Sequence, residues 1–167
     1  KYDESQRAVV AMYNEYFGGS MNSIVFQEMR EKRSLAYQAS SRYIMGSNKT
    51  DKNYNLAHIA TQNDKVVEAF DAFNSLLDYM PVAENNFDLA KQSILKSIAT
   101  NRTTKQAIIS SYLTDKEYGR KENTQKKMYE QLQKMTFEDI KAFSEQNLKG
   151  QKRVYVILGS KDQINFD

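Results

Sequence analysis

The chain has 167 residues, of which 40% are hydrophobic and 27% charged, an ordinary size and composition for one globular domain with a real core. Its 24 basic and 21 acidic residues are interspersed and give a formal net charge of only +3, so no face for nucleic acid is indicated. The absence of cysteine excludes disulfides, a thiolate nucleophile and a thiolate metal site. No apolar run approaches the ~20 residues of a membrane span.

Two helices are predicted at the start of the chain. Asp3 begins the first, and Gly18-Gly19 should end it through a left-handed C-cap. Asn22 or Ser23 can cap the second, which runs to about Arg33 and buries its apolar residues Ile24, Val25, Phe26 and Met29. Because the chain starts inside a helical pattern and without Met, we expect it to be a piece of a larger protein.

A β-hairpin is predicted next. From residue 35 to 45 the period changes to two, which places one set of side chains on the same face: Leu35, Tyr37, Ala39, Ser41 and Tyr43. Residues 46–51 are typical of a turn, and Tyr54 to Thr61 is the returning strand.

Helices dominate the rest of the sequence. Val66, Phe70, Phe73, Leu77 and Met80 form one stripe that Pro81 ends. Further helices are predicted over residues 86–102, 105–119, 124–134 and 137–148, the last with a capping box of Thr136 and Asp139.

The order of elements predicts a single α+β domain over residues 1–167, an antiparallel sheet covered on one face by helices. Val154 to Leu158 is predicted to be a final, buried strand. Three strands are few for so many helices, so we expect a first strand from upstream of Lys1.

The sequence lacks the residues of an independent hydrolase. A zinc peptidase needs about three protein ligands, and this chain has one histidine, His58, with no His-x-x-Glu-His in either direction. His58 lies mid-strand, where a structural role is favoured over contact with a ligand or partner. Gly18-Gly19-Ser20 has neither the strand before it nor the Lys-Ser/Thr after it of a phosphate-binding loop.

Arg30 and Tyr37 stand seven residues apart across the junction between the second helix and the hairpin. A guanidinium and a phenol placed there could both donate hydrogen bonds to one carbonyl or oxyanion. The alternative is a solvated helix end, favoured by the helix dipole, beside a tyrosine that packs on a helix. From the residues alone, both interpretations stay open.

The segment from Tyr16 to Tyr37 resembles the insulinase/pitrilysin family of zinc peptidases. It combines a glycine turn, a capped helix ending in Arg-Glu-Lys-Arg, and Leu-Ala-Tyr after one small residue. The resemblance continues more weakly through nearly the whole chain, in a strand and helix over residues 55–80, a helix carrying Lys91, a Thr136–Ile140 helix start and a strand closing at Gly159.

In that family, homologous half domains pair around a chamber, and one type carries zinc while its C-terminal-type partner lacks it. The resemblance to the partner type implies that this chain is inactive alone and holds no cofactor. Zinc, the water that it binds and a catalytic glutamate would lie in another domain of a zinc metalloendopeptidase. By position, Arg30 and Tyr37 would hold the peptide substrate and support its reacting carbonyl, whereas Glu28, Lys32 and Arg33 would be structural or interdomain.

Two departures and two alternatives accompany the resemblance. Ser34 stands where the family usually has glycine, and Ile24-Val25 replaces a more typical Arg-Leu. The parent could instead be a catalytically dead scaffold or assembly subunit, or the chain a free-standing peptide-binding module. The expected partners are the zinc-binding domain and a peptide. The compartment stays open, since a bacterial cytoplasm and periplasm are both compatible.

Overall fold

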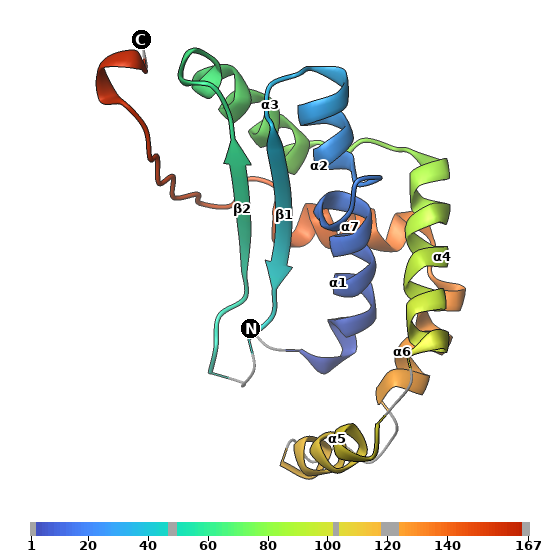
Figure 1. Cartoon of the computed structure of the whole chain (residues 1–167). Coiled ribbons are helices and arrows are strands. Elements are labelled where there is room, and N and C mark those ends of the chain that lie inside the picture. The colour runs from blue at the N-terminus through green and yellow to red at the C-terminus, as the bar shows by residue number, and fades with distance from the viewer. Residues whose placement is uncertain (1–2, 47–49, 102–103, 118–123, 165–167) are drawn as a thin grey trace.

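Helices lie against one side of a short antiparallel sheet in the computed structural model of the chain (Figure 1). The structure describes residues 3–46, 50–101, 104–117 and 124–164. The described sheet has two strands, β1 (Gln38–Ile44) and β2 (Tyr54–Ala60), rather than the three that the sequence predicts. Their register runs from Gln38 opposite Ala60 to Ile44 opposite Tyr54. The α+β prediction is confirmed.

The first predicted helix is present, but its glycines work differently from the expected cap. A 3₁₀ turn (Glu4–Gln6), α1 (Arg7–Asn14) and a π-helical turn (Glu15–Gly19) follow one another, and the Asp3 side chain accepts a hydrogen bond from the Ser5 amide. Among the described residues only Ser34 and Gly150 have positive φ, so a left-handed cap at Gly18-Gly19 is wrong. Gly18 is instead needed for close approach, because a Cβ there would lie 2.2 Å from the Ser41 carbonyl oxygen.

The second helix consists of α2 (Ile24–Phe26) and a π-helical turn (Gln27–Lys32). Ser23 is its N-cap residue, as predicted, but its buried hydroxyl makes no hydrogen bond to the described residues. Ile24, Val25 and Met29 are buried as expected, whereas Phe26 is only partly so. This helix therefore depends on its apolar contacts more than on a side-chain cap.

The predicted strand face is right from Ala39 onward and wrong at Tyr37. Ala39, Ser41 and Tyr43 are buried, but Tyr37 is 80% exposed. Leu35 and Ala36 are both buried, so the alternation begins only with β1 at Gln38. The turn predicted over residues 46–51 includes 47–49, which lie outside the described residues.

The side-chain amide of Asn14 fastens α1 to the edge of β1. Asn14 Nδ2 donates to the Tyr43 carbonyl oxygen at 3.0 Å, and the Tyr43 amide donates to Asn14 Oδ1 at 2.7 Å. Asn14 thus takes the place that a neighbouring strand would have at this residue.

The remaining helices match the predicted segments closely. They are α3 (Val66–Asp78) after a 3₁₀ turn (Asn63–Lys65), α4 (Glu84–Thr100), α5 (Lys105–Glu117), α6 (Thr124–Lys134) and α7 (Phe137–Asn147). The predicted ends at Arg102 and at Tyr118-Gly119 lie outside the described residues. The capping box is confirmed, since the Thr136 amide donates to Asp139 Oδ2 at 2.7 Å. Val66, Phe73 and Leu77 of the predicted stripe are buried on α3, whereas Phe70 is only partly buried, as is Met80, which lies beyond the end of α3.

The prediction of a buried C-terminal strand is wrong. Residues 154–158 pair with neither β1 nor β2, and Val154 and Leu158 are 91% and 95% exposed. The segment is tied instead to α3, because Arg153 forms an ion pair with Asp78 and the Tyr155 hydroxyl donates to Asn74 Oδ1 at 2.8 Å. A 3₁₀ turn (Lys161–Gln163) follows it.

An aromatic cluster joins α1, β1 and α7 in the core. Tyr13 stacks on Phe17 at 5.1 Å between ring centroids and lies 5.3 Å from Phe143, which is 5.0 Å from Tyr43. The Tyr16 hydroxyl accepts from the Ala83 amide and donates to the Pro81 carbonyl oxygen, and burial raises its pKa to about 12.

No helix of the described residues is long and apolar enough to cross a membrane.

Candidate functional site

A tight corner connects the second helix to β1. Ser34 has a left-handed φ of 50°, and its amide donates to the Arg30 carbonyl oxygen at 3.1 Å. The amides of Leu35 and Ala36 then both donate to the Met29 carbonyl oxygen, at 2.8 and 3.2 Å. The Tyr37 amide donates to the Ala60 carbonyl oxygen at 2.8 Å and begins the hairpin. The strand begins at Gln38, later than the predicted Leu35, and residues 33–37 connect it to the helix.

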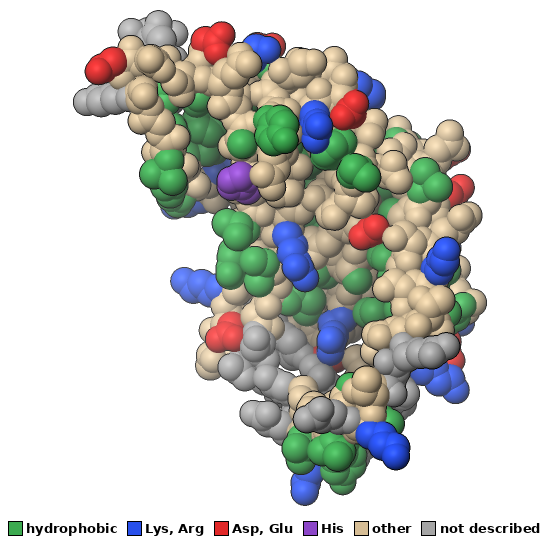
Figure 2. All heavy atoms as spheres, in the orientation of Figure 1, with side chains coloured by type: hydrophobic (Ala, Val, Ile, Leu, Met, Phe, Trp, Pro, Cys, Tyr) green, Lys and Arg blue, Asp and Glu red, His purple; other side chains and the backbone are tan. Residues whose placement is uncertain are grey.

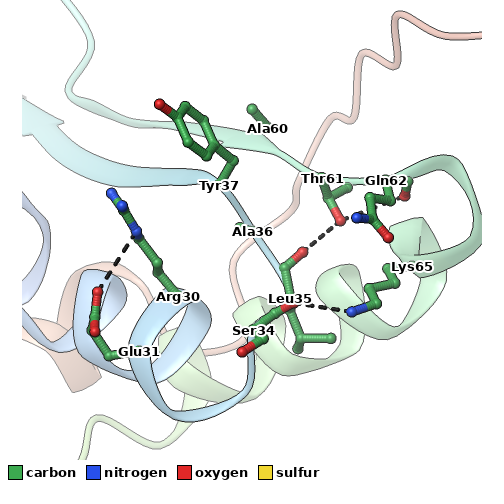
Figure 3. A pocket seen from close by; sticks show the side chains of 10 residues that line it. All are labelled: Arg30, Glu31, Ser34, Leu35, Ala36, Tyr37, Ala60, Thr61, Gln62 and Lys65. Atoms are coloured by element: carbon green, nitrogen blue, oxygen red, sulfur yellow. Dashed lines mark hydrogen bonds and ion pairs between the residues drawn. The ribbon is translucent and has the colours of Figure 1, made fainter.

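Two residues that follow β2 hold this corner from the other side (Figure 3). The Thr61 hydroxyl donates to the Leu35 carbonyl oxygen at 2.5 Å, and Lys65 Nζ donates to the Ser34 carbonyl oxygen at 3.1 Å. Consecutive carbonyl groups of the corner are therefore fixed by side chains 26 and 31 residues away. Sequence reasoning missed both residues, because no local pattern reports such a contact.

The structure brings Arg30 and Tyr37 together on one side of the corner (Figure 3). The Arg30 guanidinium carbon lies 5.3 Å from the centre of the Tyr37 ring and 5.0 Å from that of Phe26. Arg30 Nε is 3.6 Å from Glu31 Oε1, while its two terminal nitrogens make no hydrogen bond within the described residues. Contacts with two aromatic rings position a guanidinium and leave its N–H groups able to bind oxygen atoms.

Arg30 and Tyr37 line an open pocket of about 630 Å³ at the end of the hairpin. Its other lining residues are Glu31, Ser34, Leu35, Ala36, Ala60, Thr61, Gln62 and Lys65. The Arg30 side chain is 43% exposed, and Tyr37 is 80% exposed. Two cationic side chains and a phenol thus face the pocket beside one carboxylate, a set of donors suited to a carbonyl oxygen or an anion.

The other charged residues of the motif pair with one another. Glu28, whose side chain is only 15% exposed, accepts from Lys32 at 2.5 Å and lies 3.7 Å from Arg33. These contacts stay within the helix end. Lys91 does not line the pocket. Its Nζ donates to the Met135 carbonyl oxygen at 2.8 Å and ties α4 to the start of α7.

No metal site is found among the described residues. His58 lies exposed in the middle of β2 opposite Ser40, and no group of three or more His, Cys, Asp or Glu side chains in this part of the chain could hold an ion. The described residues therefore do not fit a zinc ion.

Comparison with solved structures shows the fold. The peptidase M16 inactive domain from Pseudomonas fluorescens is 20% identical, with a TM-score of 0.68 over 89% of this chain and 35% of that one. A conserved protein from Enterococcus faecalis V583 is 16% identical, with a TM-score of 0.71 over 87% of this chain and 34% of that one. The chain thus spans about a third of the length of these structures. No curated protein matches it.

Comparison with family models shows the family. The model of the peptidase M16 inactive domain matches residues 1–94, which is more than half of the chain and includes the whole corner with Arg30 and Tyr37. The chain therefore belongs to the family of the peptidase M16 inactive domain.

Proposed function

We propose that this domain binds peptide substrate for a zinc metalloendopeptidase whose zinc-binding domain lies elsewhere in the same protein or in a partner subunit. Membership of an inactive-domain family supports a role without catalysis by this chain alone. The observation that carries the proposal is the pairing of Arg30 with Tyr37 at the mouth of an open pocket, with the terminal nitrogens of Arg30 unbound in the described structure.

In this proposal Arg30 and Tyr37 act as hydrogen-bond donors to a carbonyl group of the bound peptide. Negative charge grows on a carbonyl oxygen as its carbon is attacked, so preorganised donors stabilise the transition state more than the ground state. The zinc ion of the other domain would supply the hydrolytic chemistry. This chain orients the peptide, and the hydrogen bonds from Thr61 and Lys65 keep the corner that carries both donors in place.

The test is the variant Arg30→Ala in the full-length protein. We expect turnover of a peptide to fall by roughly 10²–10³, the usual effect of losing one such donor, while zinc content and thermal stability stay unchanged. Arg7→Ala is a matched control, because the Arg7 side chain is 40% exposed, close to the 43% of Arg30, but lies on α1. Wild-type turnover by Arg30→Ala would overturn the proposal.

The second candidate is a catalytically inactive assembly subunit of the same family. The match to an inactive domain supports this candidate too, because that family description assigns no catalytic activity to this chain. The sequence of the parent protein and of its partner subunits separates the two candidates. A His-x-x-Glu-His motif with a downstream glutamate there supports the peptidase, and its absence supports the assembly role.

A further inference from the structure

We propose that the outer face of β2 binds apolar side chains of an extended peptide held in the Arg30–Tyr37 pocket. This inference rests on the proposed function and adds to it a preference of the substrate. It assigns a role to Tyr54, Leu56 and His58, three side chains that contribute nothing to the core.

The two faces of β2 differ sharply. Ala57 and Ile59 are half-buried and pack against the core, whereas Tyr54 and Leu56 are 54% and 60% exposed. Figure 2 shows the single histidine, in purple, among hydrophobic side chains on the outer surface. An outer strand face normally carries polar residues, so exposed Leu and Tyr side chains at alternate positions indicate a surface that receives something apolar.

This outer face is continuous with the pocket. Ala60, the last residue of β2, lines the pocket, and its carbonyl oxygen accepts the hydrogen bond from the Tyr37 amide. Tyr54, Leu56, His58 and Ala60 are alternate residues of one strand and therefore point to the same side. An exposed row of side chains thus runs from the pocket to the far end of β2.

The spacing of this row matches that of an extended peptide. Both have a rise of ~3.3 Å per residue, so side chains on one face repeat every ~6.6 Å in each. Leu56 is four residues from Ala60, which places it roughly 13 Å from the pocket. If Arg30 and Tyr37 bind one carbonyl group of an extended peptide, the peptide residue about four positions away along its chain would place its side chain over Leu56.

The chemistry of the row favours an apolar peptide side chain. Leu56 offers only hydrocarbon, and Tyr54 offers mainly a ring. Arg42 lies opposite Leu56 on β1, and its aliphatic stem can extend the apolar surface while its charge remains in water. An apolar peptide side chain placed over Leu56 would take apolar surface of both partners out of water, which a polar side chain would not do.

The experiment measures peptide binding to the full-length protein after removal of metal by a chelator. The cleaved bond is first located in the metal-loaded protein by mass spectrometry of the products. Labelled peptides then carry either Leu or Asn at one position at a time, from two to five residues on each side of that bond. We expect a preference for Leu of about tenfold in Kd at the position four residues away on one side, the size of a modest apolar contact.

Two variants show whether Leu56 causes that preference. Leu56→Asn should bring the Leu/Asn ratio at this position close to one and leave the other positions unchanged. Leu89→Asn should leave the ratio as in the wild type, because Leu89 is 50% exposed but lies on α4. No preference in the wild-type protein, or a preference that survives in Leu56→Asn, would overturn the inference.

The outcome also separates this inference from the proposed function. If Arg30→Ala abolishes turnover while Leu56→Asn binds every peptide as the wild type does, only the preference is wrong, and another protein domain is the better candidate to cover this face. If the full-length protein binds or cleaves no peptide, both the inference and the proposed function are overturned.

Discussion

Ser34 determines the geometry of the corner between the second helix and β1. Its φ of 50° lies in the left-handed region, which costs a residue with a Cβ about 1–2 kcal/mol and costs glycine little. The related family pattern usually has glycine at this position. The replacement of that glycine by Ser34 thus falls on the one described residue other than glycine that has a positive φ.

Replacing Ser34 with glycine tests this reading of the corner. We expect Ser34→Gly to raise the free energy of unfolding by up to ~1 kcal/mol, since glycine reaches this conformation without strain. Ser97→Gly on α4 is the control and should lower it by about 0.5–1 kcal/mol, because glycine is unfavourable inside a helix. Urea unfolding measures the free energy of unfolding of both variants. An equal loss of stability in the two would contradict the backbone strain assigned to Ser34.

Individual residues of the site differ in how far the sequence could predict them. Only residues 33–37 separate the second helix from β1, so the proximity of Arg30 and Tyr37 follows from local structure. Thr61 and Lys65 reach the same corner from the end of β2, and only the register of the hairpin brings them there. The period-two pattern places Tyr37 on the same face as Ala39, Ser41 and Tyr43, and this is wrong because the corner before Gln38 breaks the alternation.

At the level of the elements, the helical segment 4–19 meets β1 through a glycine contact. Gly18 packs so close to Ser41 that an added Cβ would lie 2.2 Å from a backbone oxygen and 2.6 Å from a backbone nitrogen. Backbone atoms cannot move aside as the end of a side chain can. The position therefore excludes any larger residue unless the helix shifts from the sheet.

We expect Gly18→Ala to destabilise the protein by about 1–3 kcal/mol, the range found for overpacked sites. Gly150→Ala provides the comparison, because Gly150 has a φ of +66° but nothing within 4 Å of an added Cβ. It should cost about 1 kcal/mol from backbone strain alone. Thermal unfolding of the two variants tests this prediction. A loss of stability in Gly18→Ala no greater than that in Gly150→Ala would show that this contact does not hold the π-helical turn (Glu15–Gly19) against β1.

The sequence predicts the helices better than the strands for a physical reason. A helix satisfies its hydrogen bonds within its own segment, so amphipathic spacing and caps such as Thr136 suffice to locate it. A strand needs a neighbour to pair with. Residues 154–158 have the composition of a strand but no described partner beside them, and they remain extended and exposed.

At the level of the whole molecule, an ion pair ties the C-terminal segment to the helical body. The hydrogen bond from Arg153, together with that from the Gly150 amide, lowers the pKa of Asp78 from its usual value. A carboxyl group with a lowered pKa in the folded state stabilises the protein at pH values above the unfolded pKa of ~3.9. That contribution is lost as the pH falls through the lowered pKa.

This attachment gives a prediction for acid conditions. We expect Asp78→Asn to reduce the free energy of unfolding at pH 7 by up to ~1 kcal/mol, the size of a partly exposed ion pair. The difference from the wild type should shrink as the pH falls from ~3.9 through the lowered pKa of Asp78, because the folded wild-type carboxyl group is then protonated too. Asp88→Asn, at an exposed position on α4, should show no such change. A constant difference across this pH range would contradict the role of the charge.

In the proposed function, the whole domain offers one part of a site, and another domain supplies the rest. Its described residues include a pocket with hydrogen-bond donors but no group able to hold a metal, and the chain spans about a third of the solved structures that it matches. In the proposed function, Arg30 and Tyr37 donate hydrogen bonds at the open pocket, and another domain carries out the catalysis.

The most direct test of this account is the turnover of Tyr37→Phe in the full-length protein. The change removes one oxygen atom and keeps the ring that contacts Arg30 at 5.3 Å, so the pocket keeps its shape. If the phenol donates to the substrate carbonyl, kcat should fall by roughly 10²-fold with zinc content and stability unchanged. A kcat equal to that of the wild type would contradict the central claim.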